Sequence, residues 1–260
     1  MTLHPSSATE PQSSRDVMVR LRGVKKRYDD FWAVKGLDLE IPRGELFGFL
    51  GPNGAGKTTT MMILAGLLQP TEGRAEIAGF NVVTQTVEAK RRLGYIPDRP
   101  YVYEKLTGNE FVSVLSDMYG VPIDEAKSNG AQWLQVLGLG EKRRELVEGY
   151  SHGMRQRLVL AATLTVDPEV LIIDEPMVGL DPQAARLFKR LMRERCTAGR
   201  TVIMSTHTMP VAEETCDRVG IMHRGRLLAE GTLEELRGSL SDEGATLEEV
   251  FFALTERESD

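Results

Sequence analysis

The stretch ELFGFLGPNGAGKTTTMMILAGLL, Glu45 to Leu68, decides the fold of this chain. Its first six residues are apolar nearly throughout, which is typical of a strand buried on both faces. A glycine-rich turn follows, and the apolar spacing then changes to that of a helix. Strand, glycine loop and helix in this order build a phosphate-binding loop. The stretch therefore predicts an α/β protein with an anion site at the glycine turn.

The octapeptide GPNGAGKT satisfies the pattern G-x-x-x-x-G-K-[ST]. Its glycines let successive backbone N–H groups converge on an anion, while Lys57 reaches the β and γ phosphates and the Thr58 hydroxyl can ligate Mg²⁺. A glycine-rich surface turn without a ligand is the alternative, but the flanking strand and helix disfavour it. The residues predicted to hold the nucleotide here are Gly51, Pro52, Asn53, Gly54, Ala55, Gly56, Lys57, Thr58 and Thr59.

A loop that binds a triphosphate needs an acidic partner, and the segment VLIIDEP supplies one after a buried strand. Asp174 is predicted to hold Mg²⁺ through its water ligands, and Glu175 to polarise the attacking water. Acidic residues at strand ends also arise from solvation alone, so this pair is a weak signal by itself. Together with the glycine loop it predicts a nucleotide-hydrolysing centre.

Composition limits the broad class of protein. The 260 residues are 41% apolar, which is ordinary for a globular core, and the net charge of −6 disfavours a general nucleic-acid binder. No apolar run approaches the roughly 18 residues that span a bilayer. Residues 1–16 lack the apolar segment of a signal peptide and are expected to form a disordered tail. Cys196 and Cys216 show neither metal-ligand nor disulfide spacing and suit a reducing cytosol.

The middle of the chain is helical in character, with no strand comparable to those on either side. Thr107 and Glu110 form a capping-box pattern at the start of one of its helices. The later strand candidates VLII, TVIMS, RVGIM and RLLAEG come with intervening helices, which predicts a parallel sheet with helices on its faces. We expect an α/β core at 17–240 with an inserted helical subdomain at about 101–168, then a short helical tail at 241–260.

Taken in order, the motifs resemble those of the ATP-binding cassette (ABC) ATPases, over roughly Val17 to Glu256. GPNGAGKT is similar to the Walker A loop, LIIDE to the Walker B strand, GLD (179–181) to the D-loop and STH (205–207) to the switch histidine. YSHGMRQR (150–157) resembles the signature motif, which separates this family from other P-loop NTPases. The resemblance implies a P-loop NTPase core with an ABC-type antiparallel β subdomain and an inserted helical subdomain.

The resemblance also implies that two cassettes pack head to tail. Ser151 and Gly153 of one cassette then contact the γ-phosphate on the glycine loop of the other, although a serine before a helix is also an ordinary N-cap. Met154 stands where the family has a glutamine that contacts the nucleotide, and the loss of that amide is expected to cost about 1 kcal/mol. His152 replaces the first signature glycine.

Four further residues take their roles from the same resemblance. Tyr28 is implied to stack on adenine, with packing at a strand edge as the alternative. His207 is implied to contact the γ-phosphate. Asp181 is implied to shape the dimer interface, and it can also cap the next helix. Asp98 replaces the family's usual glutamine; it can still accept from a metal-bound water, but it adds negative charge beside the phosphates.

The function implied is that of an ATP-hydrolysing motor subunit with ATP and Mg²⁺ as cofactors. Its partners would be separately encoded transmembrane permease subunits, which would hold it at the cytoplasmic face of the membrane as a homodimer or heterodimer. The surface around Pro100, Tyr101 and Tyr103, beside Asp98, is the expected permease contact, with a core role for the tyrosines equally open. The C-terminal stretch TLEEVFFALTE looks like that of bacterial exporters.

Two other functions compete with this one. A soluble cassette protein acting on ribosomes or nucleic acid usually carries two cassettes or coiled-coil inserts, and this chain has neither. A nucleotide kinase or GTPase shares only the glycine loop, and it would leave the signature stretch unexplained.

Overall fold

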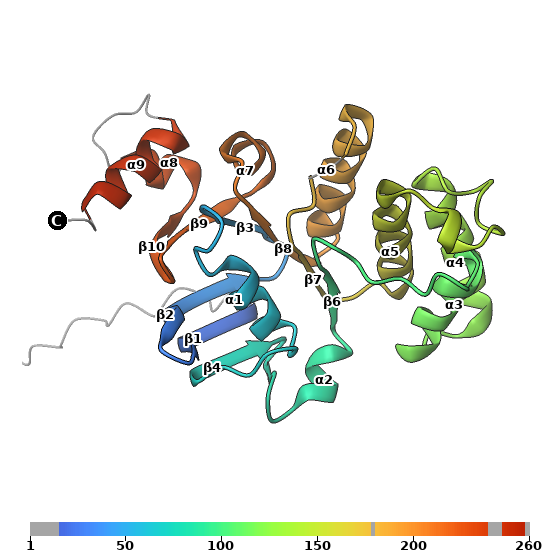
Figure 1. The fold of residues 1–260 in the computed structure, drawn as a ribbon, viewed down its shortest axis with the longest axis horizontal. Coiled ribbons are helices and arrows are strands. Elements are labelled where there is room, and N and C mark those ends of the chain that lie inside the picture. The colour runs from blue at the N-terminus through green and yellow to red at the C-terminus, as the bar shows by residue number, and fades with distance from the viewer. Residues whose placement is uncertain (1–15, 178–179, 239–245, 258–260) are drawn as a thin grey trace, which may run out of the picture.

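Two β-sheets lie side by side in the computed structural model, which describes residues 16–177, 180–238 and 246–257 (Figure 1). The smaller sheet has the order β2-β1-β4-β5, and all its pairs are antiparallel. The larger sheet has the order β10-β9-β3-β8-β7-β6. The smaller sheet contains β1 (Val17–Tyr28), β2 (Phe31–Pro42), β4 (Glu72–Ile77) and β5 (Phe80–Asn81). The larger contains β3 (Leu46–Leu50), β6 (Leu93–Ile96), β7 (Val170–Ile173), β8 (Thr201–Thr206), β9 (Arg218–His223) and β10 (Arg226–Gly231). The α/β fold with an antiparallel subdomain is thus confirmed.

The strand that precedes the glycine loop lies near the middle of the larger sheet. β3 pairs in parallel with β8 on one side and with β9 on the other, and every residue of β3 is buried. Phe47 and Phe49 face the cluster shared with the antiparallel sheet, whereas Leu46 faces the cluster shared with the inserted helices. This two-sided burial explains why ELFGFL shows no alternation of polar and apolar residues.

The prediction of a parallel sheet is wrong for its last strand. β10 pairs antiparallel with β9, and His223 lies opposite Arg226. Only Arg224 and Gly225 join the two strands, both with positive φ (43° and 83°). A two-residue connection with positive φ at both positions forms a hairpin, whereas a parallel pair requires a long crossover.

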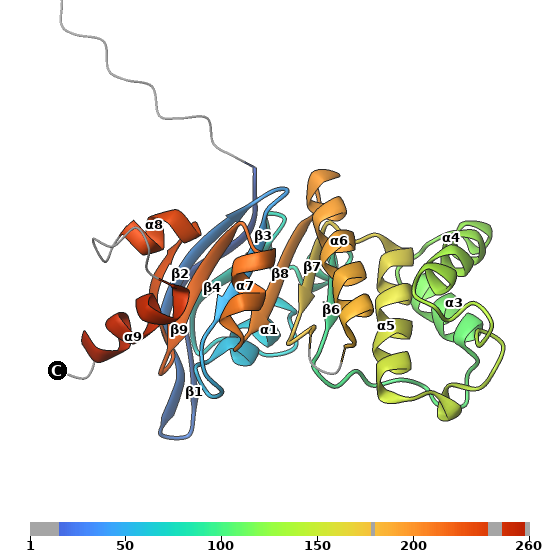
Figure 2. The same cartoon turned by 90° about the horizontal axis from the view of Figure 1, so that it is seen from above.

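Helices pack against both sheets and form the two ends of the molecule (Figure 1). They are α1 (Lys57–Leu64), α2 (Thr86–Lys90), α3 (Gly108–Met118), α4 (Ile123–Val136), α5 (His152–Val166), α6 (Pro182–Thr197), α7 (Met209–Thr215), α8 (Leu233–Gly238) and α9 (Leu247–Arg257), with a 3₁₀ turn at Val147–Gly149. The inserted helices α3, α4 and α5 form one end of the molecule, and α8 and α9 form the opposite end (Figure 2). The insert shares its apolar core with α6 and the central strands.

The helix start predicted from the capping-box pattern is confirmed. The capping box at Thr107 and Glu110 is formed in full at the start of α3. Of the predicted flanking segments, residues 1–15, 241–245 and 258–260 lie outside the described residues, while 246–257 contain α9. Within the part of the chain that is described, no helix is both long enough and apolar enough to cross a membrane.

Candidate functional site

The glycine loop joins the buried end of β3 to the first turn of α1. Gly56 is the N-cap of α1, and no side chain caps this helix. The first N–H groups of a helix have no partner within the helix, so this loop presents uncapped donors. Gly56 has φ of 105°, and a Cβ there would lie 2.6 Å from the carbonyl oxygen of Ala33. Glycine is therefore required at this position by conformation and by space.

Lys57 places a buried cation against the loop. Its Nζ donates to the carbonyl oxygens of Gly51 (2.7 Å) and Pro52 (3.2 Å) and lies 3.8 Å from Oε1 of Glu175. Burial lowers the pKa of Lys57, while Glu175 and Asp174 oppose this shift. Since the side chain is 5% exposed, its charge is directed into the loop rather than toward solvent.

Asp174 and Glu175 follow β7, which is separated from β3 by β8 in the larger sheet. Asp174 is 4% exposed, and its backbone N–H donates to the carbonyl of Ile96 on β6 (2.9 Å). The Ser205 hydroxyl on β8 donates to Oδ1 of Asp174 and accepts from the backbone N–H of Glu175 (3.0 Å). Glu175 has a left-handed backbone with φ of 49°, which is costly for a residue with a side chain.

His207 completes the cluster, because its Nδ1 lies 3.0 Å from Oε2 of Glu175. The other oxygen, Oε1, is buried and has no hydrogen-bond partner among the described residues. A buried carboxylate oxygen that lacks a hydrogen bond, a buried lysine beside it and an uncapped loop fit a site that binds a charged, hydrogen-bonding ligand. Thr58 is exposed on the first turn of α1, so its hydroxyl is available to the same ligand. The residues present thus fit a nucleotide with a bound cation.

Asp98 follows β6 by two residues, at the same edge of the larger sheet as Asp174, which follows the neighbouring parallel strand β7. Burial raises the pKa of Tyr95 to about 12, and the negative charges of Asp174 and Asp98 add to the effect. Asp98 and Asp174 therefore follow neighbouring parallel strands, and both charges act on the Tyr95 phenol. Tyr95 was not among the residues predicted from the sequence to lie near the site. Its position on the strand that leads to Asp98 could have indicated this place.

The signature segment begins a different helix, away from this cluster. Ser151 is the N-cap of α5 and accepts from the backbone N–H of Met154 at 3.3 Å. A Cβ on Gly153 would meet no atom within 4 Å, and Met154 is partly buried against the core of the insert. Among the described residues, no hydrogen bond or ion pair joins Ser151, Gly153 or Met154 to the glycine loop.

Asp181 and Tyr28, two other residues predicted for the site, contact residues close to them in sequence. Asp181 caps α6 by accepting from the N–H groups of Gln183 and Ala184 (2.9 Å each), with Pro182 in the first turn. Gly179 of the predicted D-loop lies outside the described residues. Tyr28 ends β1 with 42% of its surface exposed, and Nζ of Lys26 lies 5.3 Å from its ring centre.

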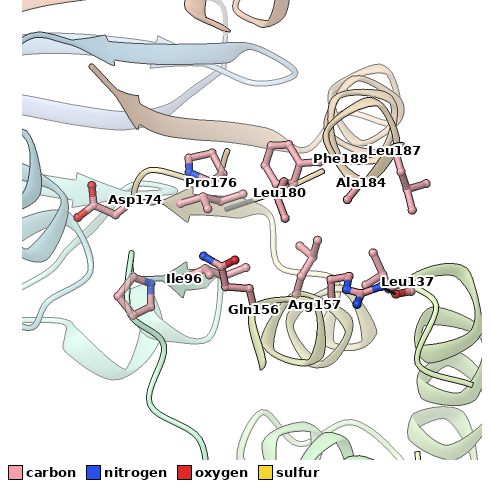
Figure 3. Close-up of a pocket in the computed structure, with 13 residues that line it drawn as sticks. Ile96, Leu137, Gln156, Arg157, Asp174, Pro176, Leu180, Ala184, Leu187 and Phe188 are labelled. Atoms are coloured by element: carbon pink, nitrogen blue, oxygen red, sulfur yellow. Dashed lines mark hydrogen bonds between the residues drawn. The ribbon is translucent and has the colours of Figure 1, made fainter. Parts of the chain in front are cut away.

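A mainly apolar cavity of about 540 Å³, counting the part open to solvent, lies behind Asp174 between α5 and α6 (Figure 3). Ile96, Leu160 and Phe188 are among its lining residues. The Gln156 side chain also lines it, and Oε1 of this residue is buried without a hydrogen-bond partner. This space therefore lies where the insert meets the core, with Asp174 at its edge.

Comparison with known proteins assigns this arrangement to a family. The family model described as ABC transporter matches residues 34–178. The linearmycin resistance ATP-binding protein LnrL of Bacillus subtilis (strain 168) is 37% identical over 84% of this chain and 70% of its own length. The daunorubicin/doxorubicin resistance ATP-binding protein DrrA of Streptomyces peucetius is 38% identical over 85% of this chain and 67% of its own. The Nod factor export ATP-binding protein I of Burkholderia orbicola (strain AU 1054) is 39% identical over 82% and 70%.

Solved structures agree with the sequence comparison. The structure of an ATP-binding subunit of an ABC transporter matches with a TM-score of 0.88 and 31% identity, over 92% of this chain and 99% of that one. A dimeric ATP-binding cassette in a post-hydrolysis state, bound to ADP and Pi, matches with a TM-score of 0.73 and 26% identity, over 83% and 99%.

Proposed function

Because this chain belongs to the ABC transporter family and is one of its ATP-binding, ATP-hydrolysing subunits, we propose that it drives export through separately encoded membrane subunits. Export is the role named for one relative, and resistance to antibiotics is named for two others. The alternative of a soluble protein acting on ribosomes or nucleic acid is not favoured, since none of these relatives is so named and the net charge is −6.

The single observation that carries the chemistry is the convergence of Lys57 and His207 on the Glu175 carboxylate, beside the glycine loop that Lys57 also contacts. Lys57 and the loop N–H groups hold the phosphates, and Tyr28 stacks on the base. Glu175 orients and polarises the attacking water while His207 holds its carboxylate. Thr58 and Asp174, with Asp98 beyond them, would hold Mg²⁺, which when bound neutralises charge on the phosphates. Together these residues supply a phosphoryl-transfer site that is complete on one side of the nucleotide.

The other side is supplied by a second cassette. Ser151 is exposed and Gly153 is partly exposed, and in the described part of the chain neither forms a hydrogen bond to its own glycine loop, which supports binding to the γ-phosphate of a partner subunit. The N-terminus of α5 adds its positive dipole end to that contact. Met154 and Asp181 lie beside the same interface. Bound ATP therefore holds two cassettes together, and hydrolysis releases them.

The membrane subunits contact the insert near its junction with the core. Tyr101 and Tyr103 are 82% and 55% exposed and stack edge to face with ring centres 5.8 Å apart. Tyr101 also borders a groove lined by Pro97, Phe111 and Tyr119. Exposed aromatic side chains beside a groove suit a short helix from a partner protein. This contact would hold the chain at the cytoplasmic face of the membrane, with the 17–240 cassette and its 101–168 insert acting as the motor.

The proposal is tested with Glu175→Gln and Lys57→Ala. Glu175→Gln removes the base but keeps the loop, so it should bind ATP, lose turnover and elute as a dimer on size-exclusion chromatography with ATP and Mg²⁺. Lys57→Ala should lose tight ATP binding and remain monomeric. A Glu175→Gln protein that stays monomeric with ATP, both alone and with its copurified membrane subunits, contradicts the two-cassette site.

A further inference from the structure

Ser205 occupies the position in the sheet that links the parts of the proposed site. It lies on β8, the strand between β3, which leads to the glycine loop, and β7, which leads to the carboxylates. Met204 pairs with Ile173 at the end of β7, and Ser205 pairs with Phe49 near the end of β3. The Ser205 side chain is fully buried, so its hydroxyl has protein groups as its only partners.

The hydrogen bonds of Ser205 have only one consistent arrangement of protons. The backbone N–H of Glu175 can only donate, so it occupies a lone pair of the Ser205 oxygen at 3.0 Å. The single hydroxyl proton is then directed to Oδ1 of Asp174. One side chain thereby holds an oxygen of Asp174 and the backbone of Glu175 at the same time.

We propose that Ser205 is a positioning residue that aims Asp174 at the metal and fixes Glu175 for catalysis. With Oδ1 held by the hydroxyl, Oδ2 is the oxygen of Asp174 left to face a metal and its water ligands. The bond to the Glu175 N–H also restrains a backbone at φ of 49°, in a region where a residue with a side chain is strained. Removing the hydroxyl frees Asp174 to rotate and Glu175 to relax.

Both the backbone and the side-chain carboxylate of Glu175 are held by residues at the end of β8. His207, one residue past β8, holds the Glu175 carboxylate at 3.0 Å, while Ser205 holds its backbone N–H. Ser205 and His207 are two positions apart in the sequence, and they contact the backbone N–H and the carboxylate of Glu175, respectively. The C-terminal end of β8 and the residue that follows it therefore hold the backbone and the carboxylate of Glu175 together.

This inference rests on the proposed function, and Ser205→Ala tests it separately. Metal-free binding of a fluorescent ATP analogue should stay within about twofold of wild type, because Lys57 and the loop are untouched. Mn²⁺ binding to the protein with a non-hydrolysable ATP analogue, followed by electron paramagnetic resonance, should weaken by about tenfold, the effect of one lost hydrogen bond to a charged group. The turnover number should fall by tenfold or more with KM for ATP little changed.

Ser116→Ala is the matched control. Ser116 is a fully buried serine of α3, and within the residues that the structure describes its hydroxyl has no hydrogen-bond partner. This variant should keep wild-type Mn²⁺ binding and turnover whatever its effect on melting temperature. Ser205→Cys fills the site with a slightly larger thiol that bonds weakly, so it should shift Mn²⁺ binding in the same direction as Ser205→Ala. It carries the test if Ser205→Ala does not fold.

The outcomes distinguish a failure of the positioning role of Ser205 from a failure of the proposed ATPase function. If Ser205→Ala and Ser205→Cys change only the melting temperature, as a purely structural serine would, the positioning role is refuted while the ATPase assignment stands. If the wild-type protein itself fails to bind Mn²⁺ with the analogue and to hydrolyse ATP, the proposed function fails first. Weakened Mn²⁺ binding with intact metal-free nucleotide binding supports the positioning role.

Discussion

Replacing Ser151 with aspartate or asparagine separates the two roles of the signature serine. Both residues are good N-caps, and they differ mainly by one charge. The existing cap bond to the Met154 N–H is 3.3 Å, at the long end of the hydrogen-bond range, so its contribution to α5 is at the low end, about 0.5 kcal/mol. Aspartate also interacts favourably with the helix dipole, so Ser151→Asp should leave the free energy of unfolding unchanged or raise it by about 0.5 kcal/mol.

Ser151→Asp should instead impair ATP hydrolysis, and by a much larger free energy than its effect on unfolding. A carboxylate roughly 4 Å from one phosphate charge is repelled by about 4 kcal/mol at an effective dielectric constant of 20, which corresponds to close to a thousandfold in an equilibrium constant. Screening by salt and Mg²⁺ reduces this, so we expect ATPase activity of Ser151→Asp at least about a hundredfold below that of Ser151→Asn.

Two measurements on each variant decide the matter. Urea denaturation gives the free energy of unfolding, and steady-state ATPase assays at low and high salt give the activity. Adding Glu175→Gln to each variant allows ATP-dependent dimerisation to be followed by size-exclusion chromatography. Equal ATPase activities and equal dimerisation for the aspartate and asparagine variants would refute the idea that Ser151 faces a phosphate of the partner subunit.

The remaining predictions concern pH, the metal and the loop. Burial raises the pKa of Cys196 and Cys216 to about 12, so the unfolded thiols ionise first as the pH rises. The free energy of unfolding should therefore fall above about pH 8.5, by about 2 kcal/mol per thiol at pH 10, and alanine variants should show a shallower fall in urea titrations. Asp98→Asn keeps an oxygen that accepts from a metal-bound water, so the Mg²⁺ concentration for half-maximal ATPase should rise only about threefold; a loss as large as that of Asp174→Asn would instead indicate direct ligation. Gly56→Ala forces a Cβ to 2.6 Å from a backbone oxygen at φ of 105°, so calorimetry should show a melting temperature lowered by several degrees, with ATP binding lost; an unchanged melting temperature would contradict the steric reasoning.

Features that depend on neighbours in the sequence were predictable from it. The buried strand, the glycine loop and α1 follow one another without interruption, and their residue types leave little conformational choice. The capping box of α3 joins residues three apart, so a pattern of two letters describes it fully. Asp174 and Glu175 could be identified as acidic residues at the end of a buried strand for the same reason.

Features that depend on which strands lie together required the tertiary structure. The direction of β10 followed from a two-residue hairpin that the strand pattern did not reveal. The bond from Ser205 to Asp174 joins residues 31 apart in sequence, and it exists because β8 lies between β3 and β7. Burial of that bond and the strained backbone of Glu175 likewise depend on the packed sheet. The sequence alone determined which chemical groups the site contains, whereas their distances and the proton arrangement around Asp174 came from packing between distant segments, because side-chain contacts across a sheet depend on strand order.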